Sequence, residues 1–272
     1  MEPMDLHTHS NMSDGTCTPS LLVEKAKAAG LGIVALTDHD CIQGIPEAME
    51  AGERLGIRVI PGLELDTEFH TELHMLGLGV DPQHPALQEF AARNAQRRQA
   101  RNEAILNQLA AAGVDVRPFF PAQHGTPTRL HVALALVAGG FAPTIGEAFR
   151  NYLFRGTPGY VETKRILPED AIALIHQAGG LAVLAHPCKV KADVAALVAR
   201  LHPAGLDGLE AFYPTATPGQ RDTYISMAQQ YGMLLTCGSD FHGDNRPDNR
   251  LGCTWQQSPL LEPVYTWLLQ RS

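Results

Sequence analysis

The stretch MDLHTHS, residues 4–10, joins a short apolar run to two histidines, and six further apolar runs follow it. Together these runs predict strands at residues 4–6, 33–36, 58–61, 73–78, 181–185, 208–211 and 234–237. Helical patterns lie between several of them, at residues 20–29, 46–55, 168–178 and 218–231. This alternation predicts an α/β fold built on a parallel, barrel-like sheet.

Residues 85–159 lack this alternation of predicted strands and helices. One long helix is expected at 87–112, and shorter helices are expected at 129–138 and 145–153. We therefore predict a barrel made of residues 1–84 and 160–272, interrupted by a helical insertion at 85–159 that acts as a substrate-binding cap.

Composition narrows the class of protein. The chain has 272 residues, 44% of them hydrophobic, which is enough for a substantial core. Its formal net charge of -8 argues against binding of long nucleic acid, which requires a basic surface. The five cysteines form no CxxC pair, the first residues do not resemble a signal peptide, and no apolar run reaches the ~20 residues of a membrane span. We expect a cytoplasmic protein without membrane contact, and the oligomeric state stays open.

Side chains that bind metals recur at the predicted strands. They are His7 and His9 after the first strand, His39 after the second, Glu64 after the third, His74 in the fourth, His186 after the fifth, and Asp240 with His242 after the seventh. The carboxyl ends of parallel barrel strands open onto one face, so these residues are expected to share a pocket. Imidazole with carboxylate suits Mn²⁺, Zn²⁺ or Fe²⁺, and a set without cysteine argues against a closed structural zinc site.

Each residue also has a structural explanation. A single histidine near a strand end usually makes a hydrogen bond or lies on the surface, and Asp14 beside Gly15 is typical of a turn. Asp38 and Asp40 flank His39 and could orient its ring. All of these explanations would have to hold together, which favours the metal site.

Six motifs resemble one family. DLHTHSNMSDGTCTP (5–19), ALTDHD (35–40), IPGLEL (60–65), LHMLGLG (73–79), LAHP (184–187) and GSDFHG (238–243) are similar, in this order, to motifs of the PHP (polymerase and histidinol phosphatase) family. The resemblance is greatest to the branch that acts on nucleoside 3′,5′-bisphosphates and on the 5′ ends of short RNA. It implies a distorted (β/α)₇ barrel with a helical insertion and up to three metal ions, often manganese.

The resemblance also implies a division of the ligands. One ion would take His7, His9, Glu64 and Asp240, a second would take Asp14, His39 and His242, and a third would share Glu64 and add His74 and His186. His186, His242 and Asp240 are expected to act in catalysis as well. Clustered divalent ions would activate a bridging water for in-line attack on phosphorus. A protonated histidine or a metal-bound water would then protonate the leaving group.

Substrate contacts are expected mainly from the insertion. Arginines recur along the predicted helix at 87–112, where a solvated charged face is the alternative explanation. By resemblance we expect substrate contacts from Arg98, Arg101, Asn102, Arg129, His131 and Lys164. Guanidinium groups suit this role because they grip phosphate oxygens bidentately. Tyr213, after the predicted sixth strand, would either stack on a base or close the pocket.

The leading hypothesis is a phosphatase that removes the 3′-phosphate of a nucleoside 3′,5′-bisphosphate. A 5′→3′ exoribonuclease acting on short oligonucleotides is the main alternative, and histidinol-phosphate phosphatase is another, since a fold alone does not select a substrate. Two hypotheses come from outside this chemistry. One is an amidohydrolase, whose barrel also begins with H-x-H, and the other is a regulatory domain that binds metal and senses a nucleotide.

Overall fold

The computed structural model describes residues 1–120, 125 and 128–270. The chain divides into two compact units. Met1–Ala91 and Arg165–Ser272 form the first, which we call the sheet unit, and Ala92–Lys164 forms the second, the helical unit. The helical unit begins and ends slightly later than the insertion expected at 85–159. Residues 121–124 and 126–127 of that insertion lie outside the described residues.

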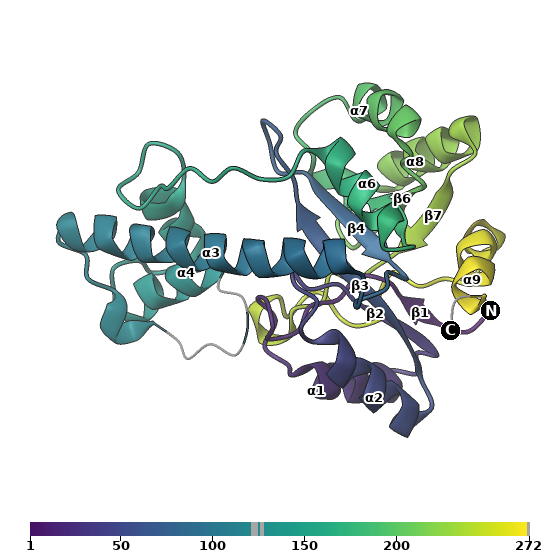
Figure 1. Cartoon of the computed structure of the whole chain (residues 1–272), viewed down its shortest axis with the longest axis horizontal. Helices are drawn as coiled ribbons and strands as arrows, with labels where there is room; N and C mark the ends of the chain where they lie inside the picture. Colours follow the sequence, from purple (N-terminus) through teal and green to yellow (C-terminus); the bar gives the residue numbers. More distant parts are fainter. Residues whose placement is uncertain (121–124, 126–127, 271–272) are drawn as a thin grey trace. The chain divides into compact units, whose positions relative to one another are not determined.

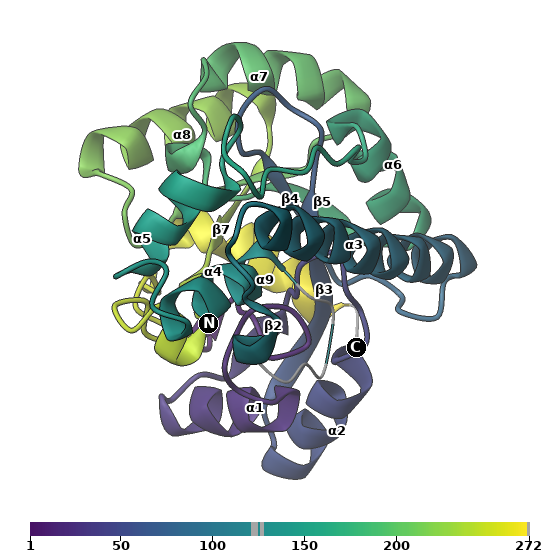
Figure 2. The same cartoon turned by 90° about the vertical axis from the view of Figure 1, so that its left-hand side faces the viewer.

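One seven-stranded sheet organises the described part of the sheet unit (Figure 1). Its strands are β1 (Met4–Asp5), β2 (Ile33–Leu36), β3 (Arg58–Asp66), β4 (His74–Leu78), β5 (Leu181–Leu184), β6 (Gly208–Phe212) and β7 (Leu234–Cys237). The helices of this unit are α1 (Pro19–Ala28), α2 (Ile45–Leu55), α6 (Pro168–Gln177), α7 (Val194–Leu201), α8 (Pro218–Tyr231) and α9 (Glu262–Leu269). Figure 2 shows α1 and α2 side by side at one end of the sheet, with α6, α7 and α8 at the other.

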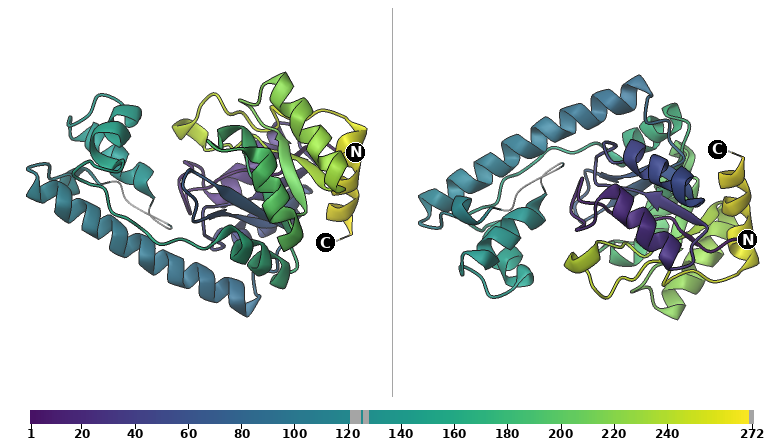
Figure 3. Two further views of the ribbon diagram at one scale, coloured as in Figure 1. Left: turned by 90° about the horizontal axis from the view of Figure 1, so that it is seen from above. Right: turned by 90° about the horizontal axis from the view of Figure 1, so that it is seen from below.

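The strands are neighbours in chain order, from β1 to β7. The pairs β1–β2, β2–β3, β5–β6 and β6–β7 are parallel, whereas β4 is antiparallel to both β3 and β5. Backbone bonds connect the two outer strands: the Leu6 N–H donates to the Cys237 carbonyl at 3.0 Å, and the His9 N–H donates to the Phe241 carbonyl at 2.9 Å. The sheet is thus a nearly closed, distorted barrel, which confirms the predicted fold class (Figure 3).

The prediction of a parallel sheet was wrong at β4, which is antiparallel to both of its neighbours. Residues 67–73 alone connect β3 to β4, and a parallel neighbour would need a crossover of a dozen residues or more. The two strands therefore form a hairpin. Pairing within the hairpin also extends β3 to Asp66, where the sequence suggested an end at Pro61. Glu64, expected after the third strand, lies inside it.

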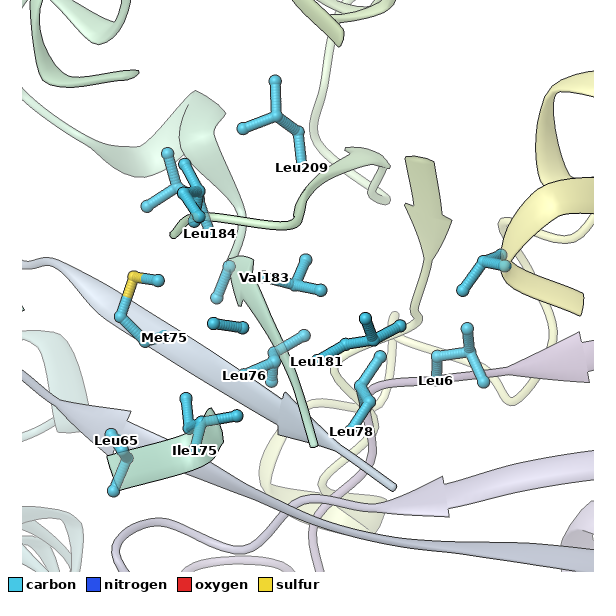
Figure 4. Packing of buried hydrophobic residues seen from close by; sticks show 14 of the residues in the cluster. Leu6, Leu65, Met75, Leu76, Leu78, Ile175, Leu181, Val183, Leu184 and Leu209 are labelled. Atoms are coloured by element: carbon cyan, nitrogen blue, oxygen red, sulfur yellow. The ribbon is translucent and has the colours of Figure 1, made fainter. Parts of the chain in front are cut away.

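Apolar side chains cover both faces of the sheet. Leu76 of β4 and Val183 of β5 are register partners and share one face, whereas Leu209 of β6 is the partner of Leu184 on the other face. All four are fully buried (Figure 4). Burial of a side chain of this size stabilises the folded state by about 1.5–3 kcal/mol. Because these strands are buried on both faces, their sequences are continuous apolar segments.

The helical unit has its own core. α3 (Pro85–Ala111) continues into it from the sheet unit, and α4 (Arg129–Ala138) and α5 (Ile145–Ala148) follow. Ile105, Leu109, Val132 and Leu136 are among its buried residues. The single helix expected at 145–153 is instead α5 followed by a π-helical turn, η2 (Phe149–Leu153).

Short 3₁₀ segments complete the secondary structure of the described residues: η1 (Arg117–Phe119), η3 (Pro187–Lys189), η4 (His202–Ala204), η5 (Gly243–Asn245) and η6 (Pro259–Leu261). The sequence pattern did not indicate α7 and α9, which are only eight residues long. None of the helices in the described ranges combines the length and hydropathy that a membrane span requires.

Candidate metal centre

The nine predicted ligands come together in the sheet unit. His7 and His9 follow β1, His39 follows β2, and Glu64 lies near the end of β3. His74 begins β4, and because that strand is antiparallel its amino end lies where the other strands have their carboxyl ends. A parallel β4 would have placed His74 at the far end of the barrel, so the hairpin is what brings it to the cluster.

Two ligands occupy unusual backbone conformations. His186 lies between β5 and η3, with φ 28°, and Asp240 follows β7 with φ 54°. Positive φ values are costly for residues other than glycine and persist where surrounding contacts enforce them, often at functional sites. Here both turns direct a predicted ligand into the cluster within three residues of the end of a strand.

His7, His9 and Asp240 offer three atoms that are close enough together to hold one ion, and an oxygen of Glu64 lies beside both histidines. The Nε2 atoms of His7 and His9 lie 3.1 Å apart, and each lies 3.3 Å from Glu64 Oε2. Asp240 Oδ1 lies 3.6 Å from the first nitrogen and 3.4 Å from the second. Ligands about 2.1 Å from a metal stand about 3.0–3.4 Å apart in octahedral or tetrahedral coordination. Every separation except the 3.6 Å between His7 Nε2 and Asp240 Oδ1 falls in this range, so the group is close to the spacing of a transition-metal site.

A second group forms around Asp14. His242 Nε2 lies 3.3 Å from Asp14 Oδ1, and His39 Nε2 lies 3.8 Å from Asp14 Oδ2. His242 Nδ1 lies 2.8 Å from the Asp240 carbonyl, which accepts only from an N–H. This contact assigns the proton to Nδ1 and leaves Nε2 as the nitrogen that offers a lone pair. His9 also lies close enough to share an ion with this group.

A third group surrounds the other oxygen of Glu64. Glu64 Oε1 lies 2.9 Å from His74 Nδ1 and 2.8 Å from His186 Nε2. Its Oε2 faces His39 Nδ1 at 3.2 Å. The two oxygens of one carboxylate thus face different sets of histidines, as expected of a ligand that bridges ions.

The electrostatics favour bound cations. Burial alone would raise the pKa of the three carboxylates, but the surrounding histidines hold each pKa well below its usual range, in Asp14, Glu64 and Asp240. Burial would likewise lower the pKa of His9 and His74, yet the carboxylates raise both to about 9. Buried carboxylates that hold protons on neighbouring imidazoles would hold a divalent cation more strongly, because its charge is larger and closer. The donor set therefore fits metal ions.

Comparison with known proteins agrees with this geometry. The model of the PHP domain family matches residues 5–185, which include six of the nine predicted ligands. The chain belongs to the PHP family.

Relatives within the PHP family act on phosphate esters. The chain is 39% identical over 249 residues to a 5′-3′ exoribonuclease, Rnm, of Salmonella typhimurium, covering 88% of this chain and 84% of the relative. It is 33% identical over 280 residues to a 3′,5′-nucleoside bisphosphate phosphatase of Chromobacterium violaceum, covering 100% of this chain and 98% of the relative. A solved structure of a Chromobacterium violaceum protein described as an amidohydrolase, with bound sulfate and no metal, is 32% identical with a TM-score of 0.88, covering 99% and 96%. This member of the PHP family is thus a metal-dependent phosphoesterase.

Glu210, in β6, makes hydrogen bonds to two of the predicted ligands. Its carboxylate oxygens lie 3.0 and 3.2 Å from His7 Nδ1, and Oε2 accepts the His186 backbone N–H at 2.7 Å. A carboxylate that accepts from one ring nitrogen directs the other nitrogen to the metal. Gly238 allows this approach, because a Cβ there would lie 2.3 Å from Glu210 Oε1 and 2.3 Å from His7 Cβ.

Asp240 is held by donors on its other side. Its Oδ2 accepts from the Tyr213 hydroxyl at 2.6 Å, from Lys189 Nζ at 3.0 Å and from Arg246. Tyr213 was expected to contact substrate, but only 3% of the residue is exposed and its ring also packs edge-on against His186. Its observed contacts are therefore with two predicted ligands, Asp240 and His186.

The sequence did not single out four of these residues. Glu210 is a charged residue inside a buried strand, and Asp66 lies two positions after Glu64 on the same face of β3, within 3.3 Å of His74 Nε2. Lys189 and Arg246 follow His186 and His242 by three and four residues. Asp38, considered as an orienting residue, accepts hydrogen bonds from the Ser10 and Ser13 hydroxyls, both at 2.6 Å.

The other predicted substrate residues lie in the helical unit. Arg98, Arg101 and Asn102 are each at most 7% exposed on α3, so this part of the helix is not an ordinary solvated face. His131 Nδ1 accepts the Thr128 backbone N–H at 3.1 Å in a capping box at the start of α4, and the Arg129 guanidinium lies 5.8 Å from the centre of the Phe149 ring. Lys164 is exposed, and its carbonyl accepts from Arg97.

Proposed function

We propose that this protein removes the 3′-phosphate of nucleoside 3′,5′-bisphosphates, such as adenosine 3′,5′-bisphosphate, and releases the 5′-monophosphate and inorganic phosphate. The observation that carries the proposal is the full-length likeness to the Chromobacterium violaceum phosphatase, which covers 98% of that relative. The ligand cluster supplies the chemistry that such a reaction requires. The sulfate in the related structure, an oxyanion with the shape of phosphate, is consistent with an anion site in this fold.

The proposed ions are Mn²⁺, up to three per chain, although the same donors suit Zn²⁺ and Fe²⁺. His7, His9, Glu64 and Asp240 would hold the first, Asp14, His39 and His242 the second, and His74 and His186 the third together with Glu64. When bound, such ions act as Lewis acids toward phosphate oxygens and lower the pKa of water.

The chain's own residues fix the protonation of the site. Burial lowers the pKa of His186, and burial together with His9 lowers that of His242 to about 4. Both imidazoles are therefore neutral at pH 7 and present a lone pair, as a ligand must. Asp240 contributes in two ways, since Oδ1 faces the histidines while Oδ2 is held by Tyr213.

We further propose that the helical unit recognises the nucleotide. Arg98, Arg101 and Asn102 are held together on one buried stretch of α3, and Asn102 Nδ2 reaches the Thr128 carbonyl at 3.5 Å beside Arg129. Arginines fixed in this way lose little conformational entropy when they bind a phosphate. His131 and Lys164 complete the proposed contacts, and Tyr213 would assist from the sheet unit by holding Asp240.

Rnm provides a second candidate. The chain is more similar to this exoribonuclease, at 39% identity, than to the bisphosphate phosphatase, at 33%. A 5′→3′ exoribonuclease acting on short RNA would use the same metal centre on a phosphodiester.

Phosphate release and chain shortening, measured side by side, separate the two functions. Metal-loaded protein is incubated with adenosine 3′,5′-bisphosphate and with a 5′-phosphorylated oligoribonucleotide. The proposal predicts a higher kcat/KM for the bisphosphate. Preferred release of mononucleotides from the 5′ end would favour the exoribonuclease. Turnover of amides or lactones but of neither nucleotide would point to an amidohydrolase, and tight nucleotide binding without turnover would point to a sensor.

A further inference from the structure

One oxygen of Asp240 has more donors than it can satisfy. Oδ2 faces the Tyr213 hydroxyl, Lys189 Nζ and Arg246, whereas Oδ1 faces the Nε2 atoms of His7 and His9. A carboxylate oxygen has about two lone-pair directions, so three donors exceed its capacity. The arrangement therefore has donor capacity for another anion.

Exposure shows which donors can serve that anion. Tyr213 is 3% exposed and is a fixed partner of Asp240. The side chains of Lys189 and Arg246 are 30% and 37% exposed, so both reach the solvent edge of the cluster. The Lys189 ammonium lies 4.8 Å from the centre of the Tyr213 ring, and this contact holds the charge in place.

The chain itself places these two cations beside the ligands. Lys189 ends η3, the turn that begins directly after His186, and Arg246 follows η5, the turn directly after His242. Short turns that start at a ligand leave little freedom for the residues three or four positions later. Both cations therefore lie at the metal centre because of the same turns that present the ligands.

We propose that Lys189 and Arg246 form a phosphate clamp beside the metal centre, which binds a terminal phosphate group and makes the enzyme prefer phosphomonoesters to phosphodiesters. The inference rests on the proposed phosphatase function and narrows its substrate class. A terminal phosphate carries up to two negative charges and three unsubstituted oxygens, enough for the arginine fork and the lysine as well as the metals. A diester carries one charge and two such oxygens, so it gains less from the clamp.

The test compares a monoester with a diester. Lys189→Met and Arg246→Met are assayed with p-nitrophenyl phosphate and bis(p-nitrophenyl) phosphate, with metal content measured in each sample. The loss of one charge-assisted hydrogen bond should lower kcat/KM for the monoester by about 10–100-fold. The diester, which meets mainly a screened surface charge, should lose about threefold or less. Arg246→Lys keeps the positive charge but loses the two-pronged guanidinium, so its kcat/KM for the monoester should lie between those of the wild type and of Arg246→Met.

The matched controls are Lys191→Met and Arg250→Met, which remove exposed cations from the same two stretches of chain. Neither should change the ratio of monoester to diester turnover. Inorganic phosphate supplies a readout that does not depend on turnover, since its affinity, measured by calorimetry, should fall about tenfold or more in both clamp variants.

Three results would overturn the clamp: equal losses on the two esters, unchanged phosphate affinity, or loss of bound metal in the Lys189 and Arg246 variants. The last would mean that these cations only neutralise Asp240. If the wild-type protein does not turn over adenosine 3′,5′-bisphosphate but its phosphate affinity still depends on both cations, the proposed function fails while the clamp stands.

Discussion

Glu210→Gln replaces one carboxylate oxygen by an NH₂ group and should lower the metal affinity of the site through its effect on His7. Glu210 now accepts two hydrogen bonds, from the His7 ring at 3.0 Å and from the His186 backbone N–H at 2.7 Å. A glutamine has one acceptor, so its NH₂ must face one of these donors. The His186 backbone N–H can act only as a donor, so it requires the amide oxygen as its acceptor. If the amide oxygen keeps that bond, the NH₂ faces His7 Nδ1, and the ring must move its proton to Nε2, the nitrogen proposed to bind metal.

The magnitude follows from this single lost bond. Loss of a charge-assisted hydrogen bond costs about 1.5–3 kcal/mol. Removal of a partner that orients a metal-bound histidine lowers metal affinity by about 10–100-fold. At 1.4 kcal/mol per tenfold, the two estimates agree, and we expect a fall of about 10–100-fold in affinity for the ion bound by His7. Activity at saturating metal should recover in part, because the ligands themselves remain.

Metal affinity is measured by competition with a chromophoric chelator, and the His7 tautomer by ¹⁵N NMR of the metal-free and zinc-loaded protein. Glu24→Gln, a change at a half-exposed glutamate paired with Arg54 on the surface of the sheet unit, is the matched control and should leave both unchanged. Metal affinity within twofold of wild type, with the proton still on His7 Nδ1, would refute this account of Glu210.

Three further predictions concern the cluster. Asp14→Ala removes a proposed ligand and should lower kcat by more than the roughly 100-fold expected of an orienting residue, with an unchanged circular dichroism spectrum; near-normal turnover with full metal would contradict its assignment. Gly238→Ala brings a methyl within 2.3 Å of His7 Cβ and should lower the free energy of unfolding by about 1–3 kcal/mol, which urea titration would detect. In the metal-free protein, the pKa of His9 and of His74 is raised to about 9 from 6.5, so their stabilising effect is complete below pH 6.5 and is lost as the pH rises through 9. The urea midpoint of chelated protein should fall over that range, and a flat or rising midpoint would count against the ion pairs.

The periodicity of the sequence was sufficient to predict most of the fold. The expected strands at 33–36 and 234–237 coincide with β2 and β7, and the helix expected at 218–231 coincides with α8. These elements follow from local chemistry, since buried strands require continuous apolar runs and α8 begins at a Thr–Pro pair and ends at Gly232. The strand ends also predicted which side chains would cluster, because barrel geometry brings those ends to one face.

The direction of β4 was not predictable from its own residues. Its apolar run would suit a parallel or an antiparallel strand, and only the short 67–73 connection decides between them. The direction matters for function, since it moves His74 from the far end of the barrel to the ligands. The sequence thus indicated His74 as a ligand by its residue type and motif, but not how it reaches the cluster.

Glu210 shows a different limit. A carboxylate in the middle of a fully buried strand must find a partner inside the barrel, because an unpaired charge there would be too costly. That requirement is visible in the sequence, but the partner is not. His7 lies 203 positions away, and its contact with Glu210 depends on closure of the sheet and on the missing Cβ of Gly238. A charged residue inside a predicted barrel strand is therefore a signal to look for a ligand that it orients, even where sequence alone cannot name that ligand.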